Sequence, residues 1–165
     1  MKIDDVISAA CEELNCSYES NALWFEVLIH QAVRSQKTSK KFMDKHTYAT
    51  IEDNKFELPA GWARLDGIYL YKTGHKYCPD IDYCVQNNTV IFDSSLGLQD
   101  GTKVTYYYKT LTVDKKNRLI LPDDWERMLV AYIGWKYSRR YAKDFGLSVM
   151  QNFQREYQTQ KLSNI

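Results

Sequence analysis

The chain has 165 residues, of which 44% are hydrophobic, and this length suits one compact domain with an ordinary core. Its 22 basic and 21 acidic residues give a formal net charge of +1, so no overall charge draws it to nucleic acid, anionic membranes or acidic substrates. No window approaches the roughly 20 apolar residues of a membrane span, and the acidic start does not resemble a secretion signal. We therefore expect a protein made in the cytoplasm, without a membrane partner.

The N-terminal part of the chain has the period of two helices. Apolar residues at helical spacing predict an amphipathic helix over residues 3–15. A second pattern follows Asn21, a suitable N-cap, and predicts a helix over residues 21–36. Its apolar arc is broad, so we expect both sides of this helix to be covered. Residues 1–30 also hold six acidic residues and one lysine.

A basic segment follows the second predicted helix. One interpretation is a solvated basic loop, and the other is a surface that faces DNA or the acidic first helices of a neighbouring copy. Contact with the DNA backbone would need no base-reading residues, so the second interpretation implies no sequence specificity. The basic residues concerned are Arg34, Lys37, Lys40, Lys41 and Lys45.

The middle of the chain, about residues 47–113, changes to short β-branched and aromatic runs, which predict antiparallel strands. Turn signals lie at residues 86–88 and 99–101. In the last run, Val104, Tyr106 and Tyr108 share one face, and the wetter face opposite holds Lys103, Tyr107 and Lys109. The many tyrosines suit ordinary sheet packing and also a protein interface. The predicted strands are "TYATIED", "DGIYLYK", "DYCVQ", "TVIFD" and "KVTYYYKTLTV".

The helical period then returns and predicts helices over residues 123–144 and 148–162. Acidic residues crowd the first turn of the third helix and basic residues its end, an order that complements the helix dipole. Residues 128–135 are apolar on nearly every side, so they must be covered from more than one direction. Ser148 and Gln151 form a capping box for the last helix.

These elements predict an α+β fold. Its N- and C-terminal helices form one helical bundle, and the β region is an antiparallel insertion in the middle. No repeat, low-complexity tract or linker marks a boundary, so we expect residues 1–165 to fold as a single domain.

Catalytic motifs do not emerge from the sequence, which has no nucleophile elbow, zinc-protease motif, P-loop or dinucleotide-binding fingerprint. The "DFG" at 144–146 stands without the other loops that give it meaning in kinases. His75 lies near Cys78 and Cys84, but a fourth zinc ligand is missing, and we expect reduced thiols. The chain is therefore expected not to be an enzyme and to hold no metal and no cofactor.

Two segments carry a family resemblance: "FELPAGWARLDGIYLY", residues 56–71, and "VTYYYKTLTVDKKNRLILPDDWERMLVAYIGWKYSRRY", residues 104–141. They resemble the head-to-tail connector, or adaptor, proteins of tailed bacteriophages. In that family an "LP" before a strand, a Tyr-rich strand, a short Asp/Asn turn, an "ILP" lead-in and a helix that becomes basic recur. The resemblance extends to the two preceding helices.

The resemblance implies a helical bundle with a β insertion, assembled as a homo-oligomeric ring, usually twelvefold, beneath the portal. Genomic DNA passes through the centre of such a ring. A terminal helix docks on the portal protein, and the β part meets neighbouring subunits or other neck and tail proteins. The implied location is the virion neck, after assembly in the host cytoplasm.

Carried over to this chain, the resemblance places the portal-facing residues on the last helix, at Met150, Phe153, Arg155 and Tyr157. The alternative interpretation is that Met150, Phe153 and Tyr157 pack on the bundle of their own chain.

Two further functions are compatible with the sequence. One is another neck or tail-completion ring protein. The other is a small nucleic-acid-binding regulator that uses the basic third helix, although the near-neutral charge and the apolar run through that helix argue against it. Large closed oligomers would favour a ring, whereas salt-sensitive DNA binding by a monomer or dimer would favour the regulator.

Overall fold

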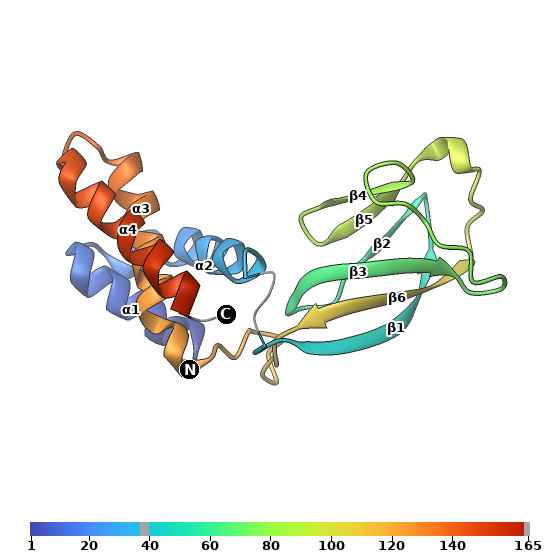
Figure 1. The fold of residues 1–165 in the computed structure, drawn as a ribbon, viewed down its shortest axis with the longest axis horizontal. Coiled ribbons are helices and arrows are strands. Elements are labelled where there is room, and N and C mark those ends of the chain that lie inside the picture. Colours follow the sequence, from blue (N-terminus) through green and yellow to red (C-terminus); the bar gives the residue numbers. More distant parts are fainter. Residues whose placement is uncertain (37–39, 164–165) are drawn as a thin grey trace. The chain divides into compact units, whose positions relative to one another are not determined.

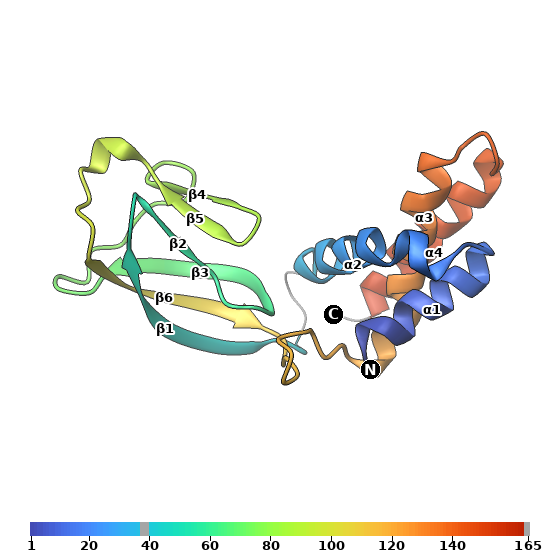
Figure 2. The ribbon, with the colours of Figure 1, turned by 180° about the vertical axis from the view of Figure 1, so that it is seen from behind.

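The computed structural model describes residues 1–36 and 40–163, and it divides the chain into two compact units. The helical unit comprises Met1–Lys41 and Thr112–Ile165, and the β unit comprises Phe42–Leu111 (Figures 1 and 2). Helices from both ends of the chain thus form one unit, and the antiparallel strands lie between them in sequence. The predicted α+β class is confirmed.

In the part of the chain that the structure describes, the helical unit has four α-helices and a short 3-10 helix. The helices are α1 (Ile3–Leu14), α2 (Tyr18–Arg34), η2 (Asp123–Trp125), α3 (Glu126–Arg140) and α4 (Leu147–Ser163). Over these described residues, no helix has the length and apolar content needed to cross a membrane.

Helix α3 lies at the centre of the helical unit, because α1, α2 and α4 all pack against it. The four consecutive residues from Met128 to Ala131 are all buried, and so are Ile133 and Gly134. Four consecutive residues span a full helical turn, so this turn has no solvent-facing side. The apolar run is therefore covered on several sides within one chain.

Helix α4 approaches α3 closely at Gly134. A Cβ atom built on Gly134 would lie 2.5 Å from Cε1 and 2.9 Å from Cγ of Phe153. One turn further along α4, Tyr157 is only 3% exposed, and its ring stacks on Trp135 with 6.0 Å between centroids. Its hydroxyl lies 2.8 Å from that of Ser35. Phe153 and Tyr157 thus attach α4 to the bundle.

The second helix differs from its predicted form in two ways. It begins at Tyr18 because Ser17 is its N-cap, whose hydroxyl accepts a hydrogen bond from the Ser20 N–H. Asn21, the predicted cap, lies within the helix and donates to the Ser17 carbonyl. The expectation that both sides of the helix are covered is also wrong, since Leu23 and Val27 are exposed.

The third predicted helix is too long at both ends. Asp123–Trp125 form a separate 3-10 turn, and α3 ends at Arg140 rather than near residue 144. Turns follow α3, so the basic residues continue beyond the end of the helix. Ser148 lies inside the first turn of α4, which begins at Leu147, rather than before that turn as the capping box predicted.

The β unit, which is described throughout, forms two three-stranded antiparallel sheets, ordered β1-β6-β3 and β2-β5-β4. Their inner faces share one core, in which the rings of Phe56 and Tyr106 lie 5.0 Å apart. The strands are β1 (Met43–Ile51), β2 (Lys55–Glu57), β3 (Trp62–Leu70), β4 (Tyr83–Gln86), β5 (Thr89–Phe92) and β6 (Thr102–Thr110).

The β region starts at Met43, a few residues before its predicted start, and β2 was not predicted. Three residues are too few to show an alternating pattern. The turn before β2 uses Asp53 and Asn54 at positive φ, and Asn87 in the predicted β4–β5 turn does the same. Asn and Asp tolerate this conformation better than most residues.

The close contact between α3 and α4 predicts that Gly134→Ala destabilises the protein. In an unobstructed helix this change gains about 1 kcal/mol, but here the added methyl group meets Phe153. Because Cγ of Phe153 is itself close, the ring cannot escape by turning about its own axis. We expect a loss of about 1–3 kcal/mol in the free energy of unfolding, measured by chemical denaturation.

The matched control is Gly146→Ala, where the nearest atom to a new Cβ is Ser148 Oγ at 3.8 Å. In a Phe153→Ala background the Gly134→Ala change should become neutral or stabilising, because the obstruction is gone. Equal effects of Gly134→Ala in both backgrounds would contradict this account of the contact.

That residues 1–165 fold as a single domain stays a prediction. Amide hydrogen exchange in rising denaturant checks it, because both units should lose protection in one common transition. Separate transitions for the two units would show two domains instead.

Candidate functional site

The outer face of the sheet β1-β6-β3 carries exposed aromatic side chains. On β6, Val104, Tyr106 and Tyr108 point into the core, whereas Lys103 and Tyr107 are exposed, so the predicted alternation is confirmed. The antiparallel register places residues of β1 and β3 beside these outward positions. The aromatic residues of this outer face are His46, Tyr48, Tyr69, Tyr71 and Tyr107.

Tyr107 forms the centre of one aromatic cluster. The His46 ring stacks on it at 5.5 Å, and the Tyr69 ring meets it edge-on at 5.6 Å. A Cβ built on Gly67 would lie 2.9 Å from the Tyr69 ring, so the absence of a side chain at Gly67 leaves room for that ring. The three rings therefore hold one another in place.

A lysine side chain organises the second cluster. The Lys103 ammonium lies 4.4 Å from the ring centre of Tyr48 and 4.2 Å from that of Tyr71, as in cation–π contacts. The two tyrosines remain 54% and 52% exposed. A hollow of about 620 Å³ adjoins them, lined by Tyr71, Lys103 and residues 97–102.

This outer face combines open aromatic area with positive charge. Such surfaces bind partners by ring packing and cation contacts, as protein interfaces do. Aromatic and cationic side chains can also stack nucleic-acid bases. The arrangement thus suits binding, and it is the candidate functional site.

The four residues predicted to face a portal lie in different surroundings. Arg155 is exposed on α4 and available to a partner. Tyr157 is buried and Phe153 packs beside Gly134, which favours the alternative that these two pack on their own bundle. Met150 is half-buried. Contact of any of them with a portal stays a prediction.

The residues of the predicted basic surface belong to both units. Arg34 is half-buried near the end of α2, and burial lowers its pKa. Lys40 is exposed, and Lys41 pairs with Asp124 at 3.1 Å, all within the helical unit. Lys45 lies on β1 of the β unit, and Lys37 lies outside the described residues. Whether these residues form one surface facing DNA or a neighbour stays a prediction.

The histidine and cysteine side chains lie in different surroundings, since Cys78 and Cys84 are exposed whereas Cys11 is buried. His75 meets Tyr77 edge-on at 5.3 Å, and burial is the main cause that lowers the pKa of His30. Burial, together with neighbouring Cys16, raises the pKa of the Cys11 thiol to about 11, so this thiol is protonated at neutral pH. Among the described residues, no three side chains of metal-binding type gather at one place.

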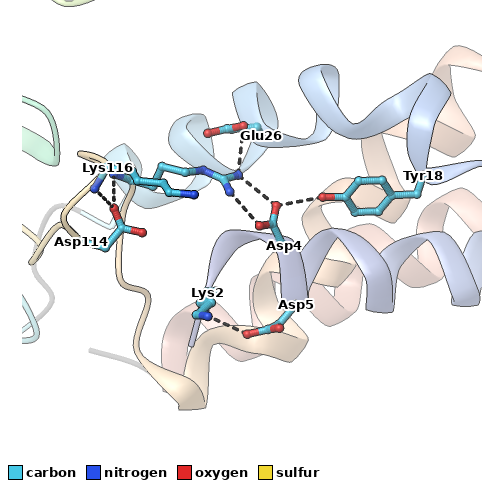
Figure 3. A network of polar contacts seen from close by, with 8 residues as sticks. Lys2, Asp4, Asp5, Tyr18, Glu26, Asp114 and Lys116 are labelled. Atoms are coloured by element: carbon cyan, nitrogen blue, oxygen red, sulfur yellow. Dashed lines mark hydrogen bonds and ion pairs between the residues drawn. The ribbon is translucent and has the colours of Figure 1, made fainter.

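A polar network around Arg118 joins the 114–118 turn to α1 and α2. The guanidinium donates to both oxygens of Asp4, at 2.7 and 3.0 Å, and to Glu26 at 3.4 Å. Figure 3 shows Asp4 also receiving a bond from the Tyr18 hydroxyl, at 2.8 Å. Arg118 and Tyr18 hold the pKa of Asp4 below its usual value.

The same turn is closed by Asp114. Its carboxylate accepts the backbone N–H groups of Lys116 at 2.7 Å and Arg118 at 3.0 Å. These bonds hold the turn and lower the pKa of Asp114. The groups of the network satisfy one another, so we interpret it as structural. Sequence reasoning missed it, because Arg118 lies 114 residues from Asp4 and 92 residues from Glu26 along the chain.

A scan against protein-family models finds no matching family, and a search of the curated proteins finds no match. Function is therefore argued from the residues and contacts above.

The network predicts a pH-dependent effect of Asp4→Asn. The pKa of Asp4 is lower in the folded than in the unfolded protein. The ionised Asp4 therefore adds to the free energy of unfolding above the unfolded-state pKa of about 3.9, and this addition is lost as the pH falls through the folded-state pKa. Because the Arg118–Asp4 ion pair is partly exposed, we expect Asp4→Asn to lower the free energy of unfolding by only about 0.2–1 kcal/mol at neutral pH. Denaturant unfolding of both proteins from neutral to acid pH measures it.

Glu13→Gln is the matched control, because Glu13 is an exposed acid of the same helix outside the network. Its effect should stay small at every pH. A difference between wild type and Asp4→Asn that persists unchanged in acid would contradict the assigned ion pair.

Proposed function

We propose that this protein is a structural subunit of the head-to-tail connector of a tailed bacteriophage. In this role it forms a homo-oligomeric ring beneath the portal, in the virion neck, through which genomic DNA passes. The observation that carries the proposal is the outer face of the sheet β1-β6-β3. The inserted β unit fills its own core and still presents aromatic and cationic side chains to solvent.

The geometry of a closed ring supports this choice. Each subunit of a cyclic assembly needs two different patches, one for each neighbour. The β unit offers tyrosines with Lys103, whereas the helical unit offers the exposed aliphatic residues Leu23 and Val27 on α2. The chain thus carries two chemically distinct candidate patches.

The apolar run of α3 gives no further support for a ring. A second subunit would be needed on one side if the chain left that side open, but α1, α2 and α4 cover the run within the chain. The argument for assembly therefore rests on the side chains that remain exposed.

The regulator alternative receives less support from α3. A recognition helix needs an exposed polar side along the part that enters the groove, whereas residues 128–131, 133 and 134 are buried. The other alternative, a different neck or tail-completion ring, would use the same exposed surfaces. Its direct partner would not be the portal, so portal binding separates the two.

The experiment is co-purification of the protein with the portal of its own phage, followed by negative-stain imaging. We expect rings stacked on the portal. Absence of any association, together with a salt-sensitive shift of duplex DNA, would replace the connector with the regulator.

A point variant tests the predicted portal contact on α4. Arg155→Glu should reduce retention by the portal by about tenfold or more, because an unfavourable charge contact in an interface costs at least about 1.4 kcal/mol, a factor of ten in affinity. Arg155 is exposed, so the change should leave the fold intact. Variants of Phe153 and Tyr157 are less suitable, because both also hold α4 on the bundle.

The control for Arg155→Glu is Lys115→Glu, an exposed charge reversal on the turn before η2. Its retention should match wild type. Equal retention of both variants and the wild type would show that this part of α4 does not meet the portal.

A further inference from the structure

We infer that copies of this protein associate head to tail, with the exposed aliphatic patch of α2 on one copy docking on the outer sheet face of the next copy. The inference rests on the proposed function and deepens it, because it names the two surfaces that meet. The occupant of the sheet face is thus a second copy of this chain.

The aliphatic patch consists of Leu23 and Val27, one turn apart on α2. They are 84% and 52% exposed. Residues four positions apart lie on the same side of a helix, so the two side chains form one stripe. A single exposed leucine is common on protein surfaces, but a neighbouring pair is an available anchor.

Acidic residues accompany this patch. Glu19 lies one turn before Leu23 on the same side of α2 and is exposed. On α1, Glu12 and Glu13 are exposed as well. The stripe on α2 is therefore apolar at Leu23 and Val27 and carries a negative charge one turn earlier, at Glu19.

The sheet face has the complementary composition. A hollow of about 620 Å³ adjoins this face where β3 ends and β6 begins, and its lining includes Leu70, Tyr71 and Leu98, which suit an aliphatic side chain. Lys72 and Lys103 line the same hollow together with one acid, Asp100, so its charged side chains are positive in balance. An aliphatic side chain from α2 can enter the hollow while Glu19 of that copy approaches the lysines. Interfaces commonly have this anatomy, with an apolar centre and a charged rim.

The charges of the β unit favour a second copy over nucleic acid. Residues 42–111 hold nine acidic and seven basic residues, so the unit as a whole does not attract a polyanion. On the outer face itself, Lys109 pairs with Asp44. A protein surface with a local apolar patch and few acidic residues therefore fits the outer sheet face better than a uniformly charged nucleic-acid strand does.

The pairing is heterologous, because the two surfaces differ and each chain carries both. Such contacts propagate from copy to copy and close into a ring where the rotation allows. Because the patches are small, we expect association of the isolated chain to be weak and to need high protein concentration.

The experiment uses sedimentation velocity on the full chain, from micromolar to submillimolar protein. Wild type should associate with rising concentration. Leu23→Asp removes the aliphatic patch and Lys103→Glu reverses the charge of the sheet face, so each variant alone should stay monomeric. An equal mixture of the two should form a heterodimer that grows no further, because it retains one intact pair of surfaces.

Two variants serve as matched controls. Leu162→Asp changes another exposed leucine of the helical unit, on α4, and Lys55→Glu changes an exposed lysine on the other sheet. Both should associate as wild type does. Adding Glu19→Lys to Lys103→Glu exchanges the two charges and should restore part of the association.

Several outcomes would overturn the inference. They are a wild type that stays monomeric throughout, a mixture that forms no heterodimer, and loss of association in Leu162→Asp equal to that in Leu23→Asp. Binding of a single-stranded oligonucleotide that Lys103→Glu abolishes and Leu23→Asp leaves unchanged would assign the face to nucleic acid instead.

The portal experiment separates this inference from the proposed function. Rings on the portal that survive both Leu23→Asp and Lys103→Glu would overturn the pairing and leave the connector role standing. Heterodimers formed as expected, from a chain that never associates with its portal, would support the pairing and overturn the connector role.

Discussion

The apolar middle of α3 must be covered from several directions, and the arrangement of the helical unit depends on this constraint. One partner helix can cover only one side, so α1 and α2 from the start of the chain and α4 from its end all pack against α3. The β segment lies in sequence between α2 and α3, and it is therefore an insertion between parts of one helical unit. Gly134 leaves room for Phe153 where α4 approaches.

The candidate binding surfaces are what remains after both cores are filled. Strand β6 gives alternate side chains to the core of the β unit, so Lys103 and Tyr107 are left on the outer face. Helix α2 gives Phe25, Leu28 and Ile29 to the helical core and leaves Leu23 and Val27 exposed. A connector subunit needs such surfaces, and the proposed pairing uses both of them between copies.

Much of the fold follows from periodicity in the sequence. The amphipathic stripe of α1 and the alternation of β6 are strong signals, and both predicted the buried residues correctly. Charge gave a weaker signal for the end of α3, because the basic residues continue into the turn after Arg140. Contacts between distant residues, such as Arg118 with Asp4, leave no local pattern at all.

The binding surfaces were harder to predict than the fold. In α2 the apolar arc is so broad that Leu23 and Val27 look like core residues, and only their exposure identifies them as a patch. The tyrosines of the sheet were compatible with both packing and binding. Register separates them, since Tyr106 and Tyr108 face inward while Tyr107 faces outward. The portal contact of α4 depends on a partner surface that this chain does not contain.

Electron cryomicroscopy of the portal vertex of the phage that encodes this protein would test the central claim most directly. The account predicts a ring of this chain beneath the portal, in which Leu23 of each copy lies against Tyr71 and Lys103 of its neighbour. A portal vertex with no density for this chain would contradict it.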